Sequence, residues 1–301
     1  MNLLSPSKVL AQVSAAIPAE CRQHVIIIGS LATGYHFFGD DAEHAVRTKD
    51  IDCVLTPRIA AVAAGQLTAQ TLLDAGWTRS EAHGWNKPGT AKTPVDQLAA
   101  VRLCPPGSDE WFLEFLTVPE SENDVGKEWT RIELRDGFFA LPSFRFLSLT
   151  TFEPLELPAL EIRCARPEMM AFANLLEHPA IKPEPMSEAI VGRAIKRSNK
   201  DLGRVLSIAR LSRDGALDTW PERWLRALRQ EFPAQWRELG GGTGRGLRAL
   251  LASPNDFEEA HHTCVTGLLA HLPSLTLENL RLTAERVLVE AVEPFEALTQ
   301  G

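Results

Sequence analysis

The chain has 301 residues, of which 45% are hydrophobic and 23% are charged, and these values are ordinary for a globular protein of one large domain or two smaller ones. The net charge of −8 excludes a global positive field that would recruit nucleic acid, so any polynucleotide would have to bind a local patch. No run approaches the ~20 apolar residues that span a bilayer. Five scattered cysteines without a Cys-x-x-Cys pair favour a reducing compartment, and we expect a cytoplasmic protein without a membrane partner.

Residues 25–28 read Val-Ile-Ile-Ile, an uninterrupted run of β-branched residues. Such a run predicts a strand that is buried on both faces. Gly29 and Ser30 follow it directly and predict a tight turn into a short helix over residues 31–38. The first backbone N–H groups of that helix could hold a phosphate.

The next strand is predicted to carry Asp50-Ile51-Asp52 and to end at Pro57. Residues two apart on a strand share a face, so both carboxylates project together while Ile51 points into the core. Two like charges this close need a cation, and Mg²⁺ suits them because it takes oxygen ligands and leaves positions open for substrate phosphates. A third carboxylate on a neighbouring strand would complete a site for two ions, the arrangement suited to in-line displacement at phosphorus.

The third carboxylate is expected on a hairpin formed by residues 98–104 and 111–118, which are joined by Pro-Pro-Gly-Ser. Glu114 is the sole charge on the apolar face of the second strand, and an isolated buried carboxylate is costly unless it meets a cation. We therefore predict Glu114 as the third metal ligand, with Asp96 as its substitute. Two alternatives stay open: the face is exposed at one end, or Glu114 pairs with Arg102 across the hairpin.

The pattern then changes from strands to helices. The remaining predicted elements are a helix at 59–75, strands within 132–149 and at 160–164, and helices at 167–176, 187–211, 221–232, 246–252, 258–272 and 277–298. On the long helix over 187–211, Arg193, Arg197, Lys200 and Arg204 form one stripe of cations. This stripe could bind a triphosphate or a nucleic-acid backbone. The alternative is a solvated face whose cations pair with acidic residues of the same helix.

A buried strand, Gly-Ser at a helix start and Asp-x-Asp on the next strand together resemble the nucleotidyltransferase superfamily that includes DNA polymerase β. The segment from Arg47 to Asp52, Arg-Thr-Lys-Asp-Ile-Asp, looks most like bacterial nucleotidyltransferase-like proteins of the AbiEii toxin type. The resemblance covers roughly the first two thirds of the chain. It implies an α/β (α+β) fold: a mixed sheet with flanking helices in a catalytic domain over residues 1–165, followed by a helical domain over 166–301.

The resemblance also implies roles for particular residues. Gly29 and Ser30 match the nucleotide-binding turn of the family, and Arg47 matches the basic residue ahead of its metal ligands. Asp50 and Asp52 match those ligands, which Glu114 would join. The segment 197–201 resembles the Arg-x-x-Lys-Asp motif of AbiEii-like proteins, which adds Arg197 to the nucleotide-binding residues and Lys200 to the catalytic ones.

The implied reaction moves a nucleoside monophosphate from an NTP to an acceptor, with two Mg²⁺ ions for which Mn²⁺ could substitute. The resemblance further implies that the acceptor is a tRNA or a protein and that the chain is a toxin with an antitoxin partner. The alternative is a non-catalytic nucleotide-binding protein with the same fold. Two features favour this alternative: Asn174 stands where relatives commonly have a lysine, and nineteen residues separate Ser30 from Asp50.

Overall fold

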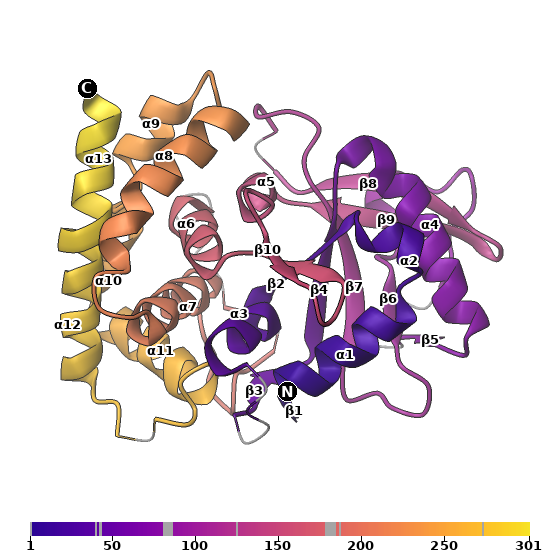
Figure 1. Cartoon of the computed structure of the whole chain (residues 1–301), viewed down its shortest axis with the longest axis horizontal. Coiled ribbons are helices and arrows are strands. Elements are labelled where there is room, and N and C mark those ends of the chain that lie inside the picture. Colours follow the sequence, from indigo (N-terminus) through magenta and orange to yellow (C-terminus); the bar gives the residue numbers. More distant parts are fainter. Residues whose placement is uncertain are drawn as a thin grey trace. The chain divides into compact units, whose positions relative to one another are not determined.

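The computed structural model describes residues 2–39, 41, 44–80, 87–124, 126–177, 185–186, 188–272 and 274–301. The chain divides into two compact units, Met1–Arg166 and Pro167–Gly301 (Figure 1). A mixed sheet with flanking helices forms the first unit, and helices form the second. The predicted α/β class is therefore confirmed. None of the helices in the described ranges combines the length and the apolar character needed to cross a membrane.

The first unit carries all of the strands among the described residues. In chain order its elements are β1 (Asn2–Leu4), α1 (Pro6–Ala16), α2 (Ala19–Arg22), β2 (Val25–Ile28), α3 (Gly29–Phe38), β3 (Val46–Thr48), β4 (Asp50–Leu55), α4 (Arg58–Asp74), β5 (Thr78–Arg79), the short 3₁₀ helix η2 (Val95–Gln97), β6 (Arg102–Cys104), β7 (Phe112–Thr117), β8 (Glu128–Leu134), β9 (Gly137–Ser143), α5 (Leu147–Thr150), β10 (Leu155–Leu157) and β11 (Ile162–Cys164). The predicted strand at 25–28 is present with those bounds as β2, and the predicted Asp-x-Asp strand is present as β4, which ends two residues before Pro57.

Seven strands form the main sheet in the order β10-β11-β2-β4-β7-β6-β5. The pairs β11–β2 and β4–β7 are parallel, and the others are antiparallel. All four residues of β2 are buried, as the β-branched run predicts. The predicted hairpin exists as β6 and β7. β4 thus lies in the interior of the sheet, paired on both sides.

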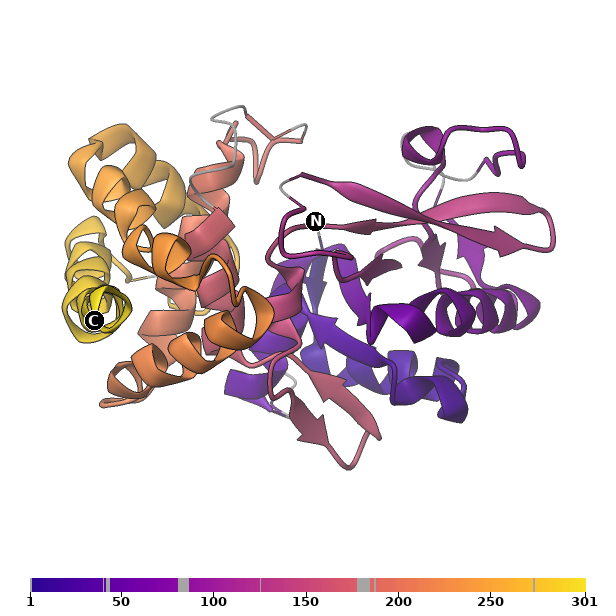
Figure 2. The same ribbon diagram turned by 90° about the horizontal axis from the view of Figure 1, so that it is seen from above.

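Helix α4 packs closely against β4 and against a separate two-stranded ribbon formed by β8 and β9. The close approach depends on Gly65: a Cβ atom there would lie 2.9 Å from the Leu55 side chain of β4 and 3.5 Å from Leu141 of β9. Figure 2 shows the magenta ribbon extended alongside the purple helix α4. This packing holds the core behind β4, with Ile51 fully buried.

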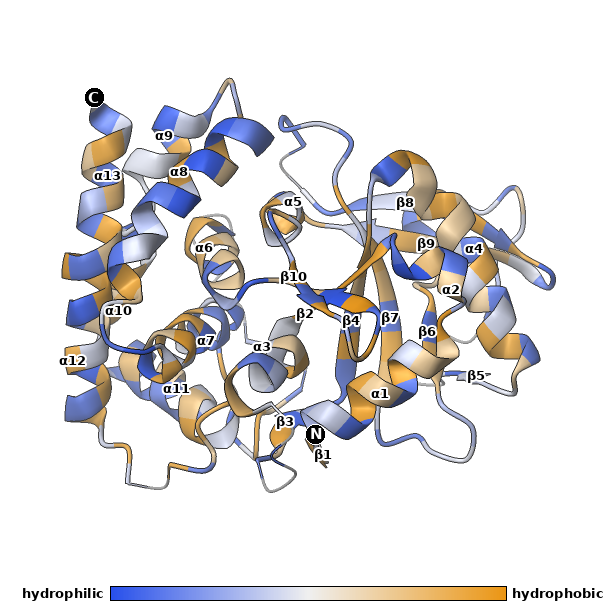
Figure 3. Cartoon of the chain, viewed as in Figure 1, coloured by the Kyte–Doolittle hydropathy of each residue, from blue (hydrophilic) through white to orange (hydrophobic). Residues whose placement is uncertain are grey.

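The second unit is helical wherever it has regular structure in the described ranges. Its elements are α6 (Pro167–Glu177), α7 (Arg197–Leu211), the 3₁₀ helix η4 (Leu217–Thr219), α8 (Trp220–Glu231), α9 (Trp236–Gly241), α10 (Arg245–Ala252), α11 (Pro254–Thr266), α12 (Leu277–Val287), the π turn η5 (Leu288–Val292) and α13 (Glu293–Gln300). Polar and apolar residues alternate along α12 and α13, the pattern of helices with one buried side (Figure 3). Phe172, Trp224 and Phe295 pack in the core, with ring centroids 4.8–5.6 Å apart.

The long helix predicted over residues 187–211 is wrong in its first part, because α7 begins only at Arg197. Val191 and Gly192 have positive φ angles of 47° and 80°, a backbone conformation that cannot continue a right-handed helix. Ile190 and Arg193 pair across this turn. Arg193 therefore does not share the helix face of Arg197, and the predicted stripe of four cations is not formed as one helical row.

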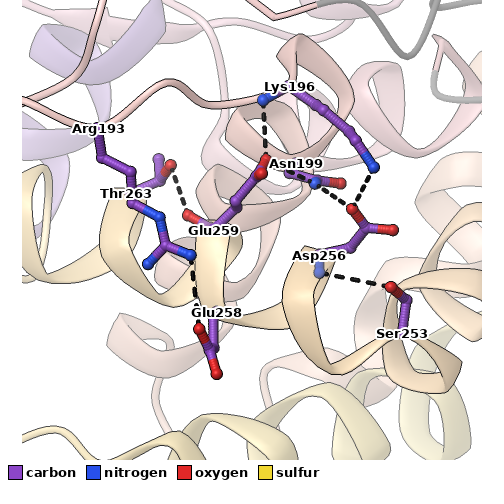
Figure 4. Close-up of polar contacts among 8 residues, drawn as sticks. All are labelled: Arg193, Lys196, Asn199, Ser253, Asp256, Glu258, Glu259 and Thr263. Carbon is purple, nitrogen blue, oxygen red and sulfur yellow. Dashed lines mark hydrogen bonds and ion pairs between the residues drawn. The ribbon is translucent and has the colours of Figure 1, made fainter.

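Polar contacts with α11 fix the start of α7 (Figure 4). The backbone N–H of Lys196 donates to Glu259 Oε2 at 2.8 Å, and Lys196 Nζ donates to Asp256 Oδ1 at 2.6 Å. The buried Asn199 amide donates to both carboxylates at 2.9 Å. We call Lys196, Asn199, Asp256 and Glu259 the α7 clamp. Because a carboxylate at a helix N-terminus satisfies unpaired N–H groups, the clamp replaces the cap that α7 lacks in its own sequence.

Candidate functional site

The strand β4 presents its two aspartates on one face of the main sheet. Asp50 and Asp52 are both half-buried, and Ile51 between them is fully buried on the other face. This alternation is the one that the sequence predicts for a strand. The Thr48 hydroxyl, which is buried, donates to Asp50 Oδ1 at 2.8 Å. The first carboxylate is thereby oriented before any ligand is present.

The register of the sheet places a third carboxylate beside these two. Asp52 lies opposite Glu114 in the parallel pair β4–β7, and Glu114 lies opposite Arg102 in the antiparallel pair β7–β6. Side chains that are directly opposite in a ladder project from the same face. Asp50, Asp52 and Glu114 therefore lie on one face of the sheet, and we call them the carboxylate row.

Glu114 is held by Arg102, one of the two alternatives that the sequence leaves open. Arg102 Nη2 lies 3.0 Å from Glu114 Oε1. Glu114 is only 8% exposed, which removes the other alternative of an exposed face. Burial raises the pKa of Glu114, Arg102 opposes that rise, and the Asp50 charge adds to it. The role of Glu114 as a metal ligand stays a prediction.

The start of α3 lies against the second aspartate. Gly29 has a φ of +82°, and a Cβ atom built on it would lie 3.1 Å from Asp52 Oδ2. Ile28, the residue before it, is paired directly with Asp52. The first turn of α3, which includes Ser30, has neither an acidic residue nor a side-chain cap. Its N–H groups thus begin next to the carboxylate row, in the place that the sequence predicts for a phosphate.

The other predicted residues have different surroundings. Arg47 is half-buried on β3, between the buried Val46 and Thr48, and pairs with Leu3 of β1. Asp96, the substitute ligand, is exposed on η2 and is not on a strand of the row. Arg197 and Lys200 belong to the second unit, where they occupy the first turn of α7. Arg197 is exposed and Lys200 is half-buried.

One charged residue near the row was not found from the sequence. The positive charge of Lys127 lowers the pKa of Glu114, and Lys127 Nζ lies 4.0 Å from the centroid of the Trp129 ring. Lys127 precedes β8, far along the chain from the hairpin that carries Glu114. The signal that could have found it is its isolation, since it is the one cation in the acidic segment 120–128.

The second unit has two acidic side chains that influence each other, the half-buried Glu177 of α6 and Asp201 of α7. The pKa of Glu177, at the end of α6, is raised to about 7, mainly by burial and in addition by the charge of Asp201. Arg197 and Arg204 act in the opposite direction. Asp201 follows Lys200 in the Arg-x-x-Lys-Asp segment and is buried. Asn174 is half-buried on α6.

The donor set of the row fits a divalent cation in part. Asp50 and Asp52 supply carboxylate oxygens on one face, the ligand type that Mg²⁺ and Mn²⁺ prefer. Glu114 is engaged by Arg102. In the part of the chain that the structure describes, no group of three or more His, Cys, Asp or Glu side chains is placed to hold a metal ion. The two aspartates therefore supply the ligand type that such a metal needs, and Glu114 would have to leave its arginine to join them.

Comparisons with known proteins do not assign a family. No protein-family model matches the chain, and no curated protein matches it. Among solved structures, it is similar to an antigenic nucleotidyltransferase-like protein from Paracoccidioides brasiliensis, with 15% sequence identity over 79% of this chain and 94% of that chain. The TM-score is 0.32, and a likeness of this size carries no argument about fold or function. The residues of the site have to carry the functional conclusion.

Proposed function

We propose that the first unit is a nucleotidyltransferase, which moves a nucleoside monophosphate from an NTP to an acceptor hydroxyl or phosphate and releases pyrophosphate. The observation that carries the proposal is the register of β2, β4 and β7. It brings the start of α3 next to Asp52, and Asp52 next to Glu114. Phosphate-binding N–H groups and metal-binding carboxylates are the two parts that phosphoryl-group chemistry needs side by side.

In this proposal Asp50 and Asp52 would hold Mg²⁺, or Mn²⁺ in its place, and Glu114 would complete a site for two ions. A bound ion would neutralise phosphate charge and polarise the phosphorus centre. Gly29 keeps the helix start close to Asp52, because any side chain there would meet the carboxylate. The N–H groups of α3 and the Ser30 hydroxyl bind the terminal phosphates, and Arg47 adds positive charge.

Arg197 and Lys200 enter the proposal through the resemblance alone, as groups that neutralise charge in the transition state. The resemblance is also the basis for proposing a tRNA or a protein as the acceptor, and for proposing that the chain is the toxin of a toxin-antitoxin pair in the cytoplasm. Growth arrest on expression of the chain that disappears with Asp52→Asn supports the toxin role. Harmless expression of a folded, active protein counts against it.

The test is incubation of the purified chain with each α-labelled NTP, Mg²⁺ and a whole-cell extract of RNA and protein. We expect label on one class of macromolecule, and loss of that label with Asp50→Asn/Asp52→Asn. Asp74→Asn is a matched control, since Asp74 is half-exposed in an ion pair with Arg135 and lies on α4. Labelling that survives the double substitution would refute the assigned site. Lys200→Ala in the same assay tests the second unit.

A specific observation supports a second candidate function, that of a non-catalytic nucleotide-binding protein. Glu114 is engaged by Arg102 at 3.0 Å, and Asn174 stands where the resemblance expects a lysine. Calorimetric binding of NTP and Mg²⁺ without release of pyrophosphate would identify this function. Release of orthophosphate instead would point to a hydrolase that uses the same carboxylates.

A further inference from the structure

We propose that Arg102 is the resident counter-cation of Glu114 and competes with the divalent cation for this carboxylate, so that their ion pair sets how tightly the site binds metal. The inference rests on the proposed function, because it takes the carboxylate row as the metal site. It assigns to Arg102 a positioning role: its guanidinium determines whether the third carboxylate is available.

The register makes the competition direct. Glu114 has Asp52 opposite it on one side and Arg102 opposite it on the other. Glu114 carries one negative charge, so it can pair closely with only one cation at a time. In the structure that cation is Arg102, at 3.0 Å. To join Asp52 around a metal ion, Glu114 has to give up a charge-assisted hydrogen bond.

The pair is also well shielded, which gives the competition its strength. The side chains of Arg102 and Glu114 are 21% and 11% exposed, whereas those of the surface pair Arg135–Asp74 are 71% and 47% exposed. A shielded carboxylate keeps its charge only while a cation accompanies it. In the structure Arg102 meets that need by direct contact, with the positive charge of Lys127 as an additional influence, and a metal ion could take the place of Arg102. The guanidinium has a second contact, 5.3 Å from the centroid of the Phe112 ring, and Phe112 lies opposite Asp50.

The experiment measures Mn²⁺ binding by calorimetry and by electron paramagnetic resonance at about pH 8, where exposed carboxyls are ionised. We expect Arg102→Gln to bind Mn²⁺ about tenfold more tightly than the unchanged chain, the size of one hydrogen bond to a charged group. Arg135→Gln is the matched control and should leave the affinity unchanged. The gain should vanish in Arg102→Gln/Glu114→Gln, which should bind Mn²⁺ like Glu114→Gln alone.

Unchanged or weaker binding in Arg102→Gln overturns the inference, as does a gain that persists without Glu114. If Arg102→Gln does not fold, Arg102→Lys keeps the charge but loses the fixed fork of donors, and we expect about threefold tighter binding. Labelled-NTP transfer on the same proteins separates the two proposals. Tighter Mn²⁺ binding without any transfer refutes the proposed reaction alone, while transfer with unchanged Mn²⁺ binding refutes the role of Arg102 alone.

Discussion

The carboxylate row of the first unit and the α7 clamp of the second unit both hold acidic side chains close to cationic ones, with opposite effects on the carboxyl pKa. In the clamp, hydrogen bonds from Lys196 and Asn199 hold the pKa of Asp256 below its usual range. In the row, burial raises the pKa of Glu114 in spite of its arginine. The clamp already has the donors that its charges need. The row gains from a further cation, which is the property expected of a binding site.

The largest expected effect is a loss of activity without a loss of stability when an aspartate of the carboxylate row is replaced. Asp52→Asn should lower nucleotide transfer by about 10³-fold, because it removes a metal ligand. Its free energy of unfolding should stay the same or rise, since the change removes a negative charge next to Glu114. Labelled-NTP turnover and a urea titration on one preparation measure both quantities. A stability loss as large as the activity loss would make the row a structural feature like the clamp.

In the clamp the expected effect is on stability. Asn199→Leu should lower the free energy of unfolding by about 3 kcal/mol, because two hydrogen bonds to charged, partly buried groups are lost. Arg193→Gln is the control, since Arg193 and Glu258 are 40% and 49% exposed at 3.5 Å and should contribute less than about 0.5 kcal/mol. Urea titration measures both. Equal effects of the two substitutions would contradict the clamp.

The pH dependence of stability tests whether the lowered pKa of Asp256 comes from its hydrogen-bond donors or is common to acidic residues of the helical unit. Glu177 lies in the same unit, but its pKa in the folded chain is about 7, above the ordinary 4.5. A raised pKa means that this group contributes stability below about pH 4.5 and loses it as the pH rises to 7. The loss should be about 2–3 kcal/mol and absent in Glu177→Gln. Parallel stability curves for the two proteins between these pH values would contradict this assignment.

The smallest expected effect concerns the contact between α3 and the row. Gly29→Ala should destabilise the chain by about 2 kcal/mol, because alanine at a φ of +82° is strained and its Cβ would press on Asp52. Gly107→Ala shares the strain at a φ of +74° but has nothing within 4 Å, so it should cost about 1 kcal/mol. The difference in urea midpoints isolates the contact with Asp52. No difference would mean that Asp52 moves freely away from α3.

Local patterns predicted the strands that carry the site, and nonlocal pairing decided the rest. The β-branched run of β2 and the alternation in Asp50-Ile51-Asp52 are properties of a few neighbouring residues, so both strands were predicted, the first with the bounds observed. The ion pair of Glu114 depends on the register between β6 and β7, and the sequence could offer Arg102 only as one alternative. Lys127 comes from a distant segment, and no local spacing links it to Glu114.

The same limit explains the error at α7. Residues 187–211 have apolar residues at helical spacing. This periodicity carries no information about the backbone angles of Val191 and Gly192, which prevent a helix from running through them into α7. The α7 clamp could not be predicted either, because its carboxylates come from α11, about sixty residues further along the chain. Polar networks of this kind become visible only when the partner helices are in place.

The interior position of β4 has a consequence for how the site responds to partial unfolding. Its backbone amides are bonded to β2 on one side and to β7 on the other. In deuterium exchange, amides of such a strand open only with the global transition, whereas edge strands such as β5 and β10 exchange through smaller fluctuations. Asp50 and Asp52 are therefore carried by one of the last parts of the first unit to open, so the spacing of their carboxylates persists while the edges of the sheet fray.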